Sequence, residues 1–226
     1  MKRSLKWSFL VILVVLLIDQ ISKIYVKTHF YYGETVHILG LDWARIQFVE
    51  NNGMAWGTEF GGKAGKLALT LFRLVAISAI GYWLVSSAKK GAPKLLLFAS
   101  ALIFAGALGN IIDSVFYGVL FDTSNPYTQN LAVLFAENNY ESLFYGKVVD
   151  MFYFPIIQNG IFPEWFPFVG GETFTFFNAI FNVADFAISC GVGILIVFNK
   201  QVFPKETKKS NVTEEELKEN QSSILE

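Results

Sequence analysis

The sequence predicts an all-α membrane protein with four transmembrane helices and a small β-containing outer segment. Two observations predict this class. The 226 residues are 53% hydrophobic and only 16% charged, so the chain is poorer in charge than an ordinary soluble domain. Four stretches are also apolar and long enough to cross hydrocarbon, which takes about 20 residues as a helix. These stretches are residues 7–26, 67–85, 95–117 and 179–198.

The uneven placement of lysine and arginine predicts how these stretches are oriented. Basic residues precede the first stretch, separate the second from the third, and follow the fourth. Residues 118–173, in contrast, contain only Lys147 as a basic residue. By the positive-inside rule, we expect both termini and the short middle loop in the cytoplasm.

Two longer segments then lie outside, at residues 27–66 and 118–178. Within the first, residues 44–55 predict a short strand pair or turn. The second is rich in aromatic residues, which favour the headgroup level of a bilayer, and it is interrupted by prolines. We therefore divide the chain into one four-helix membrane domain at residues 1–200 and a disordered, charged cytoplasmic tail at residues 201–226.

The first stretch carries two opposite charges near its outer end. Asp19 and Lys23 are four residues apart with the acid first, which is the favourable order for an ion pair on a helix. The pair either ties helices together or belongs to a functional site, and the sequence leaves both readings open. The residues that follow Asp19 lack the small-residue pattern of a cleavage site, so we expect this stretch to remain as a helix.

Polar residues recur on one face of the third and of the fourth stretch. Both series are spaced by four, three and four residues, which places each series along one face of a helix. The series are Gly106, Asn110, Asp113 and Tyr117, and then Asn178, Asn182, Asp185 and Ser189. Gly106 and Gly109 indicate close helix packing, and Asn178 indicates a hydrogen bond between helices.

Two carboxylates at the predicted outer boundary indicate chemistry. Asp150 lies in the second outer segment, and Asp185 lies near the outer end of the fourth stretch. Carboxylates close to hydrocarbon are costly, and they mark an ion path, a partner charge or an active site. His29 and His37 lack the close acidic partners of a zinc motif, so we predict no metal and no cofactor.

Five short motifs in order resemble the lipoprotein signal peptidase (signal peptidase II) family, over most of the chain from Asp19 to the end of the fourth stretch. They are Asp19-Gln20-x-x-Lys23, Asn51-x-Gly53-x-Ala55, Gly106-x-x-Gly109-Asn110-x-x-Asp113, Gly146-x-Val148-Val149-Asp150 and Phe181-Asn182-x-Ala184-Asp185. The resemblance implies an intramembrane aspartyl endopeptidase that removes signal peptides from diacylglyceryl-modified bacterial prolipoproteins, cutting before the lipidated cysteine. It also implies a multi-pass protein of the bacterial cytoplasmic (inner) membrane with its active site near the outer face. The expected partners are these substrates and membrane lipid; we expect a monomer and no nucleic acid.

Carried over residue by residue, the resemblance assigns the catalytic pair to Asp150 and Asp185. The positions that match site-supporting or substrate-contacting residues are Asp19, Lys23, Asn51, Gly53, Gly106, Asn110, Asp113, Asn182 and Ala184. Three positions depart from the family pattern: Ser114 stands where arginine is usual, and Trp56 and Met151 stand where phenylalanine is usual. The long second outer segment also contains Asp122 in a similar motif, so Asp122 remains an alternative to Asp150.

The proposed pair suits hydrolysis without a metal. One group must deprotonate water while another polarises the carbonyl and protonates the leaving amine. Two close aspartates in a low dielectric share one proton and can fill both roles. Two other readings remain: a small proton-coupled membrane transporter that uses Asp113 and Asp185, and a membrane assembly protein whose polar residues only join helices.

Overall fold

The computed structural model describes residues 3–53 and 61–204, and three of its helical runs are long and apolar enough to cross a membrane. The first two are α1 (Arg3–His29) and α2 (Gly62–Lys90). The third comprises α3 (Lys94–Ile112), a π-helical turn (Asp113–Tyr117) and α4 (Gly118–Leu120). Each of the first three predicted stretches is therefore confirmed as a long helix, and each helix extends beyond the predicted bounds.

The fourth predicted stretch is a shorter helix than expected. Helix α5 (Val183–Val197) has 15 residues and is followed by the short helix α6 (Asn199–Val202). It begins four residues later than predicted because Ile180–Phe181 forms strand β6, and Asn182 then caps the helix. The count of four membrane spans stays a prediction.

Because α5 begins at Val183, the first two residues of the polar series predicted on this helix, Asn178 and Asn182, lie before it. Asn178 lies before β6, where its side-chain oxygen accepts a hydrogen bond from the Tyr153 hydroxyl at 2.8 Å on the exposed surface. The prediction that Asn178 joins two helices is therefore wrong. Asp185 lies in the first turn of the helix instead of within it.

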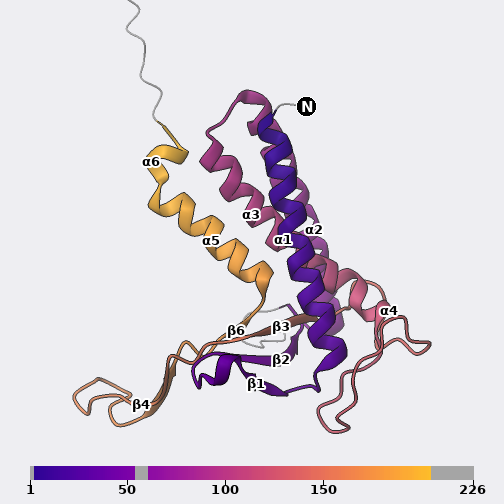
Figure 1. Cartoon of the computed structure of the whole chain (residues 1–226), viewed down its shortest axis with the longest axis vertical. Helices are drawn as coiled ribbons and strands as arrows, with labels where there is room; N and C mark the ends of the chain where they lie inside the picture. Colours follow the sequence, from indigo (N-terminus) through magenta and orange to yellow (C-terminus); the bar gives the residue numbers. More distant parts are fainter. Residues whose placement is uncertain (1–2, 54–60, 205–226) are drawn as a thin grey trace, which may run out of the picture.

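A four-stranded antiparallel sheet lies at the end of the bundle where α1 ends and α5 begins (Figure 1). Its order is β1-β2-β3-β6, with β1 at Thr35–His37, β2 at Arg45–Asn51 and β3 at Val148–Tyr153. For residues 44–55 we predicted a short strand pair or turn; the described part of this range instead forms the single strand β2, which pairs with β1 and β3 outside it. Its pairing with β3 was not predicted, and it joins the two outer segments into one sheet. Ala55 and Trp56 lie outside the described residues, as do residues 205–226 of the predicted tail.

The second outer segment divides into two parts. Its first part packs on the sheet through Phe121 and Ala132, which share a buried cluster with Val26, Phe48 and Val149. Its second part is a hairpin of β4 (Ile157–Ile161) and β5 (Thr173–Phe176) that projects away from the sheet (Figure 1). The hairpin exposes large aromatic side chains, among them Trp165 and Phe168.

Two glycines permit the close approach that brings the functional residues together. A Cβ atom on Gly106 would lie 2.2 Å from the carbonyl oxygen of Ala184, so α3 and α5 touch backbone to backbone there. This confirms the close packing predicted from Gly106. A Cβ atom on Gly146 would lie 2.0 Å from the carbonyl oxygen of Asp113, so only glycine lets the chain that enters β3 pass the π-helical turn.

Candidate functional site

A single buried ammonium group joins α1 to α3. Lys23 is fully buried, and its Nζ lies 3.0 Å from Asp19 Oδ2, 2.9 Å from Asp113 Oδ2 and 2.8 Å from Asn110 Oδ1. An ammonium has three N–H donors, and each of the three finds an acceptor here. The ion pair predicted between Asp19 and Lys23 is confirmed, and it ties helices together.

The two aspartates beside Lys23 extend this connection to α5 and β3. Asp19 Oδ1 accepts a hydrogen bond from the backbone N–H of Ala184 at 2.9 Å, which satisfies one of the free amides at the start of α5. Asp113 Oδ2 accepts from the backbone N–H of Val149 at 3.3 Å. Both carboxylates are buried, so each is stabilised by these bonds as well as by the ammonium.

Asn110 connects Lys23 to two residues at the start of α5, the N-cap Asn182 and Asp185. Its side-chain oxygen accepts from Lys23, and its Nδ2 donates to Asp185 Oδ1 at 2.8 Å. The same Asn110 oxygen accepts from Asn182 Nδ2 at 3.1 Å. The side-chain oxygen of Asn110 therefore joins Lys23 of α1 to the Asn182 cap, while its Nδ2 bonds to Asp185 of α5.

Asn182 contacts both candidate catalytic carboxylates. Its Nδ2 donates to Asp150 Oδ1 at 2.7 Å. Its backbone N–H donates to Asp185 Oδ2 at 3.2 Å, and its side-chain oxygen accepts from the Asp185 N–H at 2.9 Å, which forms a capping box. The residue that begins α5 thus brings a carboxylate of β3 and a carboxylate of α5 to one place.

Asp150 lies on β3, is only 4% exposed and faces two amide donors. Its second oxygen accepts from Asn51 Nδ2 at the end of β2. The Asn51 amide is oriented because its oxygen accepts from the backbone N–H of Gly53, which has a φ of +80° that favours glycine. The motif residues Asn51 and Gly53 therefore hold Asp150 from the side opposite Asn182.

Burial and a neighbouring charge both oppose ionisation of Asp150. Burial is the larger effect, and the charge of Asp185 is the next; together they raise the pKa of Asp150 to about 7. The hydrogen bonds from Asn182 and Asn51 act in the opposite direction, because they stabilise the carboxylate. Asp185 is thus close enough to influence Asp150 electrostatically, and Asp150 can carry a proton near neutral pH.

Asp122, the alternative to Asp150, lies elsewhere. Its Oδ1 accepts a hydrogen bond from the backbone N–H of Val133 at 2.7 Å within the long outer segment. The nearby buried charges are Lys27 and Glu50, which form an ion pair between α1 and β2. The structure therefore joins Asp150, and not Asp122, to the network that contains Asp185.

Two polar residues at this site were not among the predicted site residues. Gln20 Nε2 donates to both Asp19 Oδ2 and Asp113 Oδ1 at 3.0 Å, which stabilises the two carboxylates. Arg73 of α2 donates to the backbone oxygen of Gly53. Arg73 is the only charged residue within residues 67–85, and a charge inside an apolar stretch is itself a signal of function.

Comparison with known proteins gives the chain a family context. The family model described as signal peptidase (SPase) II matches residues 11–200. A lipoprotein signal peptidase of Porphyromonas gingivalis is 47% identical over 188 residues, covering 82% of this chain and 79% of that protein. A lipoprotein signal peptidase of Amoebophilus asiaticus is 32% identical and covers 97% of this chain and 90% of that protein.

A solved structure is also similar. It is described as a bacterial membrane enzyme, shares 25% sequence identity and has a TM-score of 0.53. The match covers 90% of this chain and 94% of the other. The helices and the sheet therefore follow the architecture of a known membrane enzyme.

We predict that Lys23→Met destabilises the protein by about 3–5 kcal/mol, because it leaves the buried carboxylates of Asp19 and Asp113 without their cation. Thermal unfolding of the purified protein in detergent measures the effect. Lys63→Met is the matched control. It removes an exposed partner of Glu141, and such surface pairs contribute less than about 1 kcal/mol. Equal losses of stability in the two variants would contradict the role given to Lys23.

Proposed function

Since the chain belongs to the signal peptidase II family, we propose that it removes signal peptides from bacterial prolipoproteins and that Asp150 and Asp185 catalyse the hydrolysis. The observation that carries this proposal is the convergence of the two carboxylates on Asn182, which donates to one and caps the helix of the other. Asp19, Lys23 and Asn110 act as positioning residues that hold Asn182 and Asp185 in place.

The reaction needs one proton on the pair. In the form with a protonated Asp150, Asp185 takes a proton from water as the water attacks the peptide carbonyl. Asp150 donates its proton to the carbonyl oxygen, which becomes the hydroxyl of the tetrahedral intermediate. When that intermediate collapses, Asp185 returns a proton to the leaving amine and Asp150 recovers its own from the hydroxyl. The pair ends the cycle with the same single proton.

We propose that the site lies where the sheet meets the hydrocarbon, within reach of a substrate that is anchored in the membrane. We propose that the cut falls before a cysteine that carries diacylglycerol, whose acyl chains stay in the outer leaflet. The signal helix then reaches the pair from the side of the bundle. Burial of Asp150 on β3 supports a site that excludes water, and a dry site strengthens the interactions of a developing charge.

We propose four membrane spans with both termini in the cytoplasm of a bacterial inner membrane. α5 and α6 together supply the fourth span, from Val183 to Val202. In this topology the sheet and the aromatic hairpin lie at the outer face, where tryptophan and phenylalanine suit the membrane interface.

The rival reading as a proton-coupled transporter has less support. It requires Asp113 and Asp185 to act together, yet Asp113 bonds to Lys23, Gln20 and Val149. Asp185 bonds instead to Asn110 and Asn182. The reading as an assembly protein accounts for the bonds between helices but gives no reason for a carboxylate with a raised pKa beside a second acid.

Asp150→Asn and Asp185→Asn are each expected to lower cleavage of a diacylglyceryl prolipoprotein by about a thousandfold or more, because each removes a proton donor or acceptor. Release of the signal peptide from purified protein without added metal is the measurement. Asp122→Asn is the control and keeps its activity. Full activity in either of the first two variants would refute the assignment.

The pH dependence should follow the raised pKa of Asp150. Protonated Asp150 is present at low pH and is lost as the pH rises through about 7, so kcat/KM should fall about tenfold per unit above that pH. A profile of kcat/KM for wild type and Asp122→Asn tests this, and the two curves should coincide. A rate that stays constant through neutral and alkaline pH would show that the proton on Asp150 is not needed.

The topology is testable by cysteine labelling in a Cys190→Ala background. Trp165→Cys in the hairpin should react with a membrane-impermeant maleimide on intact cells. Lys90→Cys, at the end of α2, should react only after the membrane is opened, because the proposed topology places it inside. Both side chains are exposed, so access is limited by the membrane alone. The reverse labelling pattern would overturn the proposed orientation.

A further inference from the structure

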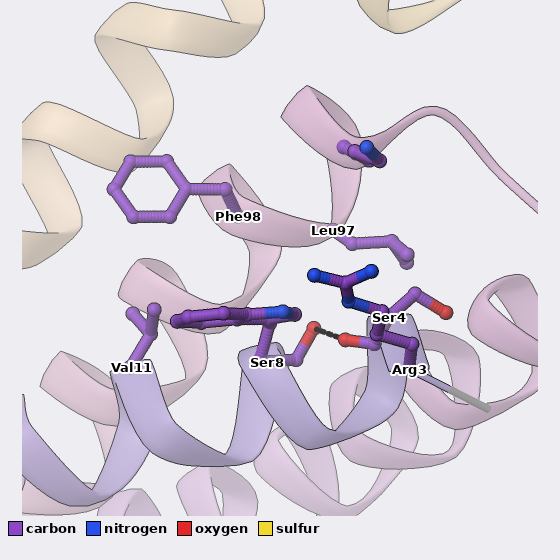
Figure 2. A pocket seen from close by; sticks show the side chains of 8 residues that line it. Arg3, Ser4, Ser8, Val11, Leu97 and Phe98 are labelled. Carbon is purple, nitrogen blue, oxygen red and sulfur yellow. Dashed lines mark hydrogen bonds between the residues drawn. The ribbon is translucent and has the colours of Figure 1, made fainter. Parts of the chain in front are cut away.

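A hollow lies between α1 and α3, at the end of the helices opposite the sheet. It has a volume of about 650 Å³. Figure 2 shows Arg3, Ser4, Ser8 and Val11 of α1 on one side of it and the side chains of α3 on the other. The complete lining is Arg3, Ser4, Trp7, Ser8, Val11, Lys94, Leu97 and Phe98.

The mouth of this hollow is positively charged. Arg3 and Lys94 line it from two different helices, and within residues 3–53 and 61–204 neither forms an ion pair with a carboxylate. The described parts of the helices at this end contain no aspartate or glutamate: the first acid along α1 is Asp19, and α2 and α3 have none. Both α1 and α3 begin here, so the positive ends of two helix dipoles add to the two side-chain charges.

The walls of the hollow are apolar. Trp7 and Val11 of α1 face Leu97 and Phe98 of α3, and Trp7 and Phe98 are largely exposed, at 58% and 42%. Tryptophan is typical of the membrane interface, with its ring beside acyl chains and its N–H at the headgroup level. The hollow therefore combines an anion-attracting mouth with walls that suit hydrocarbon.

We propose that this hollow binds one anionic phospholipid of the cytoplasmic leaflet. The phosphate lies between Arg3 and Lys94, and one acyl chain runs along Trp7, Val11 and Phe98. Basic pockets between membrane helices on the cytoplasmic side are suited to anionic headgroups, because each lysine or arginine adds a favourable interaction with them. Apolar walls distinguish this ligand from a free phosphate ion, which has no group to place against them.

The site is separate from the candidate catalytic site. Arg3 lies 16 residues before Asp19 on the continuous helix α1, which is about 24 Å along the axis. The inference rests on the membrane orientation proposed above and not on peptidase activity. Lipid binding can therefore succeed or fail independently of cleavage.

The experiment is a titration of the full chain in detergent with dioleoyl phosphatidylglycerol and with dioleoyl phosphatidylcholine, read by native mass spectrometry. The wild type should bind phosphatidylglycerol more tightly than phosphatidylcholine. Arg3→Gln with Lys94→Gln should lower the affinity for phosphatidylglycerol by about tenfold or more. Lys6→Gln with Lys90→Gln is the matched control: it removes two positive charges near the same end, outside the lining, and should change the affinity little.

Two further measurements test whether the hollow holds a phospholipid or only a phosphate ion. Val11→Trp fills the apolar part of the hollow and should weaken phosphatidylglycerol binding while both cations remain. Inorganic phosphate should not displace the lipid at equal concentration. Any of three results would overturn the proposal. They are an equal loss of affinity for phosphatidylglycerol in the pocket and control variants, equal binding of the two lipids, and displacement of the lipid by inorganic phosphate. Thermal unfolding of each variant in detergent, measured in parallel, shows whether it is folded.

Discussion

The structure depends on one buried cation. Lys23 is surrounded by apolar helices, and a charge in such a place is stable only if its donors are all paired. Its three partners are Asp19 on its own helix and Asn110 and Asp113 on the third helical run. Asp19 and Asn110 bond in turn to the start of α5, at Ala184 and at the Asn182 cap, and Asp113 bonds to β3. The hydrogen bonds and ion pairs of the Lys23 ammonium therefore hold β3 and α5, which carry Asp150 and Asp185, in place.

The proposed chemistry requires carboxylates that are close but not both ionised. Asn182 brings the carboxylates close, because its side chain bonds to Asp150 while its backbone bonds to Asp185. Burial of Asp150 and the charge of Asp185 oppose ionisation of Asp150. Glycine makes the arrangement possible, since any larger residue at position 106 would separate α3 from the start of α5. The capping box and the close helix contact thus serve one purpose, which is to hold Asp185 near a strand that comes from a distant part of the sequence.

Much of this arrangement could be predicted from the sequence because it depends on local spacing. The helical period placed Asn110 and Asp113 on one face of the third stretch, and the four-residue separation of Asp19 and Lys23 predicted their ion pair. The start of α5 could not be predicted in this way. Ile180–Phe181 is apolar and reads as helix, but it pairs with β3, and strand pairing between distant segments leaves no local signal. The roles of Gln20 and Arg73 also emerge only when α1, α2 and α3 are assembled.

The most direct test is whether the charge of Asp185 raises the pKa of Asp150. In protein labelled with ¹³C at aspartate carboxyls, one NMR signal should titrate near pH 7 and be absent in Asp150→Asn. In Asp185→Asn the midpoint of that signal should move to lower pH, because the neighbouring negative charge that raises the pKa of Asp150 is gone. An unchanged midpoint in Asp185→Asn would contradict a shared site for the two acids.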